Sequence, residues 1–310
     1  MLKYTHILNY FYSNTWAMRL DKLQAIDMFL TTKALGNDIS AEEVEAMVQA
    51  ARPARAQRTT GNVAVLPIMG VISHRASMLH DISEGGGTSA EQLSKQFAAV
   101  VEDPSVGTIL LDVDSPGGTV TGVPELADQI FEARSKKKVY AVVNSQAASA
   151  AYWLASQAQE LIITPSGDVG SIGVYMMHQD ISERMKQAGV TTTFIKAGKY
   201  KTEGNPYMPL DEEAQAAFQE RVSHHYEDFV KAVARGRGVN ASDVRNGFGE
   251  GRMVMSGDAI KIGMADRIAT MDETLRGLGA IGPSQAIRAE ETGLSEADRR
   301  RMELDLFNFI

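Results

Sequence analysis

The apolar positions of this chain follow two patterns, short unbroken runs and helical spacing. Runs rich in Val, Ile and Leu recur through the middle of the chain and predict buried strands. These strands are predicted at 63–66, 108–113, 139–143 and 161–164. Helix starts fall between them, at Ser89, Pro124 and Ser149. Alternation of this kind predicts βαβ crossovers, so we expect an α/β fold with a mainly parallel sheet.

The two ends of the chain differ from this middle part. Residues 1–50 place apolar residues at helical spacing, and 51–61 is a polar, Arg-rich connector. After Ala280 the strand signals stop, and a charged tail follows. We therefore expect three parts: a helical N-terminal segment and connector at 1–60, an α/β domain at 61–280 and a charged tail at 281–310.

A long helix is predicted from Asp211 to Ala234, and a short strand at 191–195. The helix carries one apolar face, which is either core or a contact between subunits. This face consists of Phe218, Val222, His225, Phe229 and Val233.

The strongest chemical signal is Ser149, which lies among small residues directly after the strand at 139–143. A turn of this composition, between a buried strand and a helix, is expected to expose a nucleophilic hydroxyl. Ser145 and Ser156 compete for this role, but Ser145 ends the strand and Ser156 lies inside the helix. The alternative for Ser149 is an ordinary helix N-cap.

Two consecutive glycines, Gly117 and Gly118, follow the strand at 108–113. Glycines allow backbone N–H groups to approach a ligand closely, as an oxyanion hole requires. A tight turn is the simpler alternative. Phosphate binding is disfavoured because the chain contains neither of the usual glycine-rich phosphate motifs.

The candidate general bases lie further along the chain. Lys196, Lys199 and Lys201 follow the strand predicted at 191–195. An ordinary lysine has a pKa near 10.4, so a lysine base has to be desolvated to stay neutral. His178, with Asp180 two residues on, is the rival base in a Ser–His–Asp arrangement. The sequence alone does not choose among the lysines.

Four segments, in this order, resemble the SppA (signal peptide peptidase A, protease IV) family of serine peptidases. They are Ser-Pro-Gly-Gly at 115–118, Ala-Ala-Ser-Ala-Ala-Tyr-Trp at 147–153, Gly-Ser-Ile-Gly-Val at 170–174 and Gly-Lys-Tyr-Lys at 198–201. The resemblance covers residues 62–275. It implies a spiral of ββα units, as in the ClpP and crotonase relatives.

The resemblance also implies a role for each candidate site residue. Ser149 and Lys201 would form a Ser–Lys catalytic dyad. The backbone N–H groups of Gly118 and Ala150 would form the oxyanion hole. Gly117 and Ser171 would support the site, with the Ser171 hydroxyl orienting the lysine amine.

Within the family, the chain is most similar to the phage head-maturation branch, on the segments 8–17 and 70–75. This likeness implies cleavage of scaffold or capsid precursor proteins by a homo-oligomer, in the bacterial cytoplasm or the phage prohead. Alternatives are a cytoplasmic bacterial SppA-type peptidase, an inactive structural capsid subunit and a crotonase-like acyl-CoA enzyme. The last leaves the segment 198–206 without a role.

Composition narrows the classes of partner. The formal net charge is −8 and there is no long basic run, which disfavours nucleic-acid binding. There is no cysteine, and the histidines show no metal-ligand spacing, so we expect neither a metal nor a cofactor. No run of about 18 apolar residues occurs, so we expect no membrane anchor.

Overall fold

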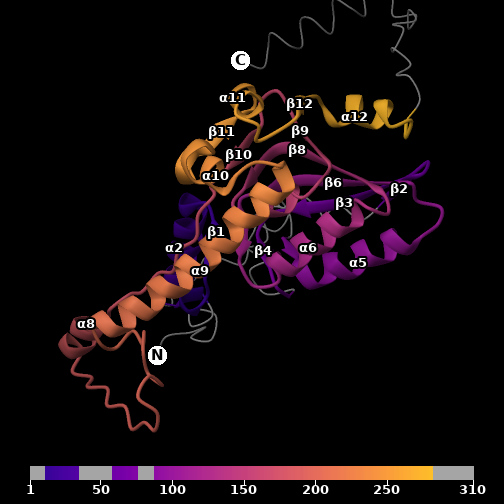
Figure 1. Ribbon diagram of the computed structural model, residues 1–310. Coiled ribbons are helices and arrows are strands. Elements are labelled where there is room, and N and C mark those ends of the chain that lie inside the picture. The colour runs from indigo at the N-terminus through magenta and orange to yellow at the C-terminus, as the bar shows by residue number, and fades with distance from the viewer. Residues whose placement is uncertain (1–10, 35–57, 76–86, 282–310) are drawn as a thin grey trace, which may run out of the picture.

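A computed structural model describes residues 11–34, 58–75 and 87–281. Its main sheet has eight strands, six of which run side by side in the order β11, β10, β8, β6, β3, β2 (Figure 1). Strand β9 pairs with β8, and β12 pairs with β9. The bounds are β2 Arg58–Thr60, β3 Val63–Met69, β6 Thr108–Ser115, β8 Lys138–Ala148, β9 Glu160–Ile163, β10 Asp168–Gly170, β11 Met253–Met255 and β12 Arg267–Ile268.

The central strands are apolar on both sides because both faces of the sheet are covered. Along β6, Ile109 and Leu111 belong to the larger apolar core, whereas Leu110 belongs to a second cluster on the opposite face. The neighbouring pairs β3 with β6 and β6 with β8 are parallel. An all-apolar run is the pattern expected of buried parallel strands, and it is why the sequence revealed these strands.

Helices cover both faces of this sheet. The larger core includes side chains of α5 Ala90–Glu102, α6 Val123–Ala133, α7 Ala150–Ala155 and α9 Glu212–Arg237, and the smaller one those of α12 Met271–Gly277. Ser89 caps α5 as predicted, because its side chain accepts a hydrogen bond from the Gln92 N–H. Among the described helices, none combines the length and the apolar character needed to cross a bilayer.

A second, smaller sheet lies at the carboxyl ends of the main strands. It has the order β1 Trp16–Met18, β7 Gly117–Thr119, β4 Ile72–Ser73 and β5 Thr88–Ser89. The chain thus passes from a long strand to a short strand of the second sheet and then to a helix, as in β6, β7 and α6. This repeated order confirms the α/β class and the ββα units.

The N-terminal part departs from the prediction in two places. Residues 16–18, expected to be helical, form β1, because their backbone groups pair with a strand about 100 residues further on. Residues 58–60, expected in the connector, form β2 at the edge of the main sheet. Helix α2, Leu20–Ala34, agrees with the prediction. The boundaries at 60 and 280 stay predictions, and the tail beyond 281 lies outside the described residues.

Between β10 and α9 the chain forms an arm that leaves the core. It contains α8, Ser182–Gln187, followed by an irregular stretch, and the chain returns to the core as α9 (Figure 1). No residue between Ile172 and Ala214 is buried. The strand predicted at 191–195 is wrong for the protomer: these residues are irregular, because no sheet edge lies beside them.

The long helix α9 divides into two halves. Phe229 and Val233 at its C-terminal end are buried in the larger core, whereas Phe218, Val222 and His225 on the same face are only half-buried. The predicted apolar face therefore belongs to the core at its C-terminal end and to the arm at its N-terminal end.

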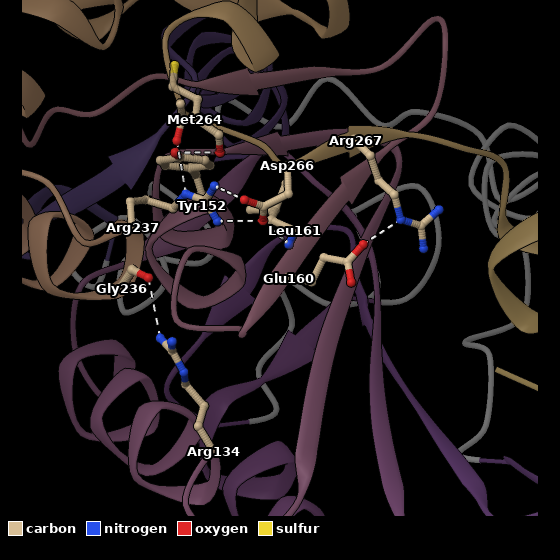
Figure 2. A network of polar contacts seen from close by, with 10 residues as sticks. Arg134, Tyr152, Glu160, Leu161, Gly236, Arg237, Met264, Asp266 and Arg267 are labelled. Carbon is tan, nitrogen blue, oxygen red and sulfur yellow. Dashed lines mark hydrogen bonds and ion pairs between the residues drawn. The ribbon is translucent and has the colours of Figure 1, made fainter. Parts of the chain in front are cut away.

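A polar network joins the C-terminal end of α9 to the main sheet (Figure 2). The Arg237 guanidinium forms two hydrogen bonds to the Asp266 carboxylate, at 2.9 and 2.7 Å. The other bond to this carboxylate comes from the Leu161 N–H at 2.7 Å. Burial raises the pKa of Asp266, but the hydrogen bonds from Arg237 and Leu161 outweigh it, so the pKa lies below its ordinary value.

Asp266→Asn is expected to lower the free energy of unfolding by about 2 kcal/mol, because Arg237 would stay buried without its counter-charge. This figure is smaller than for a fully buried pair, since the Asp266 side chain is 38% exposed. A carboxylate with a lowered folded-state pKa stabilises the fold above its unfolded pKa, and this contribution is lost as pH falls through the folded pKa. In urea unfolding between pH 7 and pH 3, the free energy of unfolding should fall more steeply for wild type than for Asp266→Asn. Asp258→Asn, in an exposed pair with Lys261, is the control and should change little.

Candidate active site

Ser149 lies where β8 ends and α7 begins, at the carboxyl edge of the main sheet. Its backbone is in a strained region, with φ 55° and ψ −118°. Its N–H donates to the Gly170 carbonyl at 2.7 Å, and its hydroxyl donates to the Gly173 carbonyl at 3.3 Å. The side chain makes no capping hydrogen bond, so Ser149 is not an ordinary N-cap.

The expectation of an exposed hydroxyl is wrong, because Ser149 has 0% exposure. The competing serines have other surroundings. Ser145 is exposed within β8, and the Ser156 hydroxyl donates to the Trp153 carbonyl at 2.9 Å. Ser145 also has a positive φ, of 129°, but it lies within β8. Of the three serines, only Ser149 lies at the turn from β8 to α7, at the carboxyl ends of parallel strands, where ligands bind in open α/β sheets.

Gly117 and Gly118 form the strand β7 beside this turn. Gly117 has φ 96°, and a Cβ there would lie 2.9 Å from the Ala148 carbonyl oxygen. A Cβ on Gly118 would lie 1.8 Å from the Ile72 carbonyl oxygen, so only glycine fits. The glycines therefore bring β7 against the residue that precedes Ser149, beyond what a simple tight turn would require.

Helix α7 leaves N–H groups free at its start. The first helical hydrogen bond runs from the Trp153 N–H to the Ser149 carbonyl, so the Ala150 N–H has no partner within the helix. Trp153 stacks on Phe229 of α9 with ring centroids 4.5 Å apart, and the Tyr152 hydroxyl donates to the Met264 carbonyl. These contacts fix the helix that follows Ser149.

Ser171 follows Gly170, whose carbonyl accepts from the Ser149 N–H. Its φ is 52°, in the left-handed region that non-glycine residues rarely adopt. The structure thus brings Ser149, Ala150, Ser171 and the Gly117–Gly118 strand to one place. Among the residues it describes, no group of three His, Asp or Glu lies where it could hold a metal ion.

The candidate lysines lie elsewhere, in the arm. The Lys199 ammonium donates to Glu213 at 2.6 Å and to the Tyr200 hydroxyl at 2.9 Å, which raises the pKa of Lys199 above its ordinary value. The Lys196 ammonium donates to the Lys199 carbonyl. Lys201 is exposed, and its ammonium has no hydrogen-bond or ion-pair partner among the described residues.

The arm separates these lysines from Ser149 of the same protomer. Glu213, the partner of Lys199, lies sixteen residues before Phe229 on α9, which corresponds to about 24 Å along the helix. Phe229 is the residue that contacts the serine helix. A single protomer therefore does not bring Lys201 to Ser149, and the dyad stays a prediction.

His178, the rival base, is also bound elsewhere. Its Nε2 lies 3.2 Å from the Asn205 carbonyl oxygen in the arm. Asp180 accepts hydrogen bonds from Ser182, which lower the pKa of its carboxyl group. The two residues are committed to local contacts rather than to a triad with Ser149.

Sequence reasoning missed the strand β1 beside the site. Its three residues, Trp16–Met18, are buried and pair with β7. A run of three apolar residues is too short to indicate a strand, and its partner is distant in sequence. The residues are visible in the sequence, but their pairing is not.

Comparisons with known proteins show which proteins this chain is similar to. Residues 132–280, which include Ser149, Ser171 and Lys201, match the family described as Peptidase family S49. The chain is 34% identical over 236 residues to the head-tail preconnector protein GP5 of Enterobacteria phage P21 (76% of this chain, 46% of the relative). It is 31% identical over 252 residues to the capsid assembly protease C of Escherichia phage lambda (79% of this chain, 56% of the relative).

Two further proteins are more distantly similar to the chain. Protease 4 of Haemophilus influenzae is 28% identical over 215 residues (69% of this chain, 34% of the relative). Among solved structures, ClpP1 from Listeria monocytogenes is similar with a TM-score of 0.42 at 16% identity, over 68% of this chain and 94% of that one. The chain spans about half the length of the phage relatives that it matches. On these matches, residues 132–280 are similar to the domain of Peptidase family S49.

Proposed function

We propose that this chain is a serine endopeptidase with Ser149 as its nucleophile. The observation that carries the proposal is the strained turn at Ser149, which lies beside β7 within a domain of a peptidase family. The N–H groups of Gly118 and Ala150 would stabilise the oxyanion that forms when the hydroxyl attacks a peptide carbonyl. This arrangement suits acyl transfer.

The reaction proceeds in two halves, with Lys201 as the base. Neutral Lys201 takes the Ser149 proton as Oγ attacks the carbonyl carbon, and it returns that proton to the amine as the C–N bond breaks. Water, deprotonated by the same lysine, then attacks the ester; as the bond to Ser149 Oγ breaks, the lysine returns the proton to that oxygen and the acid is released. Ser171 would orient the lysine amine.

Lys201 would reach the serine of an adjacent protomer. The arm that carries it extends from the core and contains no buried residue, and large apolar side chains on it are exposed. They include Val190, Ile195, Tyr200 and Met208. A neighbouring subunit that covers this arm would also desolvate the amine, as a lysine base requires.

The proposed substrates are scaffold and capsid precursor proteins, cleaved in the host cytoplasm or the prohead during phage head maturation. Support comes from the names of the two phage relatives. The alternative is a cytoplasmic bacterial SppA-type peptidase that degrades peptides. Incubation of the purified protein with a capsid precursor and with unrelated unfolded proteins tests the choice: specific cleavage supports the phage role, and indiscriminate cleavage contradicts it.

Labelling with a fluorophosphonate tests the activity itself. The reagent should modify wild type at Ser149 and leave Ser149→Ala unlabelled. An unlabelled wild type in its assembled form would favour an inactive structural subunit.

Activity is expected to fall on dilution, because each site would need a lysine from a neighbour. Peptide hydrolysis per subunit should decline over the same concentration range in which sedimentation velocity shows dissociation. A fully active 33.7 kDa monomer would contradict the shared site.

A further inference from the structure

The strand β1 lies along one edge of β7, the strand that carries Gly117 and Gly118, and β4 lies along the other edge. The two strands are antiparallel, and Ala17 is opposite Gly118. The pairing extends past both ends of β1. The Val120 N–H donates to the Thr15 carbonyl at 3.1 Å, and the Arg19 N–H donates to the Pro116 carbonyl at 3.0 Å.

These two bonds define which backbone groups of β1 point at β7. In an antiparallel pair, hydrogen-bonded residue pairs alternate with non-bonded ones. Since residues 15 and 19 are bonded to β7, the pair of Ala17 and Gly118 is of the bonded type. The Ala17 carbonyl therefore faces the N–H group that we assign to the oxyanion hole.

The Ala17 carbonyl also lies close to the serine turn. A Cβ on Gly117 would lie 2.3 Å from the Ala17 carbonyl oxygen and 2.9 Å from that of Ala148. Ala148 directly precedes Ser149. The carbonyl of Ala17 and that of the residue before Ser149 thus lie on the same side of Gly117.

The other edge of β1 pairs with the segment that follows the serine turn. The Trp16 N–H donates to the Tyr175 carbonyl at 2.9 Å, and the Tyr175 N–H donates to the Trp16 carbonyl at 3.0 Å. Ser149 bonds to Gly173 in that same segment. The strand β1 therefore fills the space between the two backbone edges that flank the nucleophile.

Trp16 and Met18 of β1 belong to an apolar cluster separate from the main core, whereas Ala17 belongs to the main core. The buried members of the separate cluster are Phe11, Trp16, Met18, Leu23, Ile26, Leu30 and Val71. All of them except Val71 come from residues 11–30, and Tyr175 and Met177 pack against the cluster from the arm side. Among the buried residues of 11–34, Ala17 alone belongs to the larger core, so departure of the segment would remove one small side chain from that core.

We propose that β1 is a built-in pseudo-substrate, which occupies the peptide-binding edge of β7 and has to leave before a polypeptide substrate can bind there. The inference rests on the proposed function, because that function assigns the oxyanion donor. It accounts for the burial of Ser149, which the strand and its flanking edges cover. A substrate would take the place of β1 as an antiparallel strand, with a small residue such as Ala opposite Gly118.

A disulfide across the pair of Thr15 and Val120 tests the proposal. The chain has no cysteine, so Thr15→Cys with Val120→Cys creates one defined bond, and paired cross-strand residues lie at a separation that a disulfide can bridge. We expect the oxidised variant to hydrolyse peptides at least tenfold more slowly than the same protein after reduction. Each single variant is a control and should not respond to the reductant.

Equal rates in the oxidised and reduced double variant, both abolished by Ser149→Ala, would overturn the pseudo-substrate and leave the proposed function intact. A reduced protein without Ser149-dependent hydrolysis would contradict the proposed function instead. In that case the pseudo-substrate proposal is tested by peptide binding rather than by hydrolysis.

Binding is measured by fluorescence anisotropy with a labelled synthetic peptide of residues 11–21. The proteins compared are the oxidised and reduced double variants and full-length Ala17→Pro, which weakens β1 because proline cannot donate to the ladder. We expect affinity to rise in that order, with at least tenfold between the first and the last. Equal affinity for the oxidised and reduced forms would overturn the proposal.

Discussion

Ser149→Ala is expected to lower kcat/KM for peptide hydrolysis by at least about 10³-fold, while the protein stays folded. Loss of a serine nucleophile removes the covalent route, and only binding and the oxyanion hole remain. The hydroxyl contributes little to stability, since its hydrogen bond to the Gly173 carbonyl is long, at 3.3 Å. Thermal unfolding of the variant should follow wild type within a few degrees.

Ser145→Ala is the matched control. Ser145 lies on the same strand, four residues earlier, and its side chain is exposed, so its removal should leave hydrolysis close to wild type. Near-normal activity of Ser149→Ala, or a severe loss in Ser145→Ala, would show that the nucleophile has been misassigned.

The buried parallel strands were predictable because each is a local apolar run. The runs at 108–113 and 139–143 gave β6 and β8, and the serine turn follows from the end of β8. The burial of both sheet faces makes such strands visible without any knowledge of their partners.

The strand β1 and the burial of Ser149 were not predictable, because both depend on pairing across the chain. Trp16–Met18 acquire strand geometry only from β7 and Tyr175. Their apolar side chains fit a helix equally well on sequence grounds. Ser149 is buried and bonds to Gly170 and Gly173, which are distant in sequence, whereas its neighbours in sequence suggest an open turn.

The arm shows a different limit of sequence-based prediction. Its apolar pattern is clear, but the protomer offers no core for that pattern to pack against. The face of α9 continues from Phe229 back to Phe218, yet only its C-terminal end lies in the core. The proposed assembly of several subunits would bury the rest of this apolar stripe, of which a single subunit explains only part.

Lys201→Ala is expected to reduce kcat by at least about 10³-fold, whereas Lys199→Ala should retain most activity. The difference follows from their partners. Glu213 and Tyr200 raise the pKa of Lys199 and keep it protonated, so it cannot accept the serine proton, while Lys201 has no such partner among the described residues. Single-turnover hydrolysis on the assembled protein would compare the two variants.

A lysine base also predicts the direction of the pH dependence. Its neutral form is the active one, so kcat should rise with pH until the lysine of the assembled enzyme is deprotonated, and His178→Ala should leave that profile unchanged. If His178 were the base, His178→Ala would instead abolish hydrolysis. If Lys199→Ala were inactive and Lys201→Ala active, the ion pair with Glu213 would have to break on assembly, and the dyad would be Ser149 with Lys199.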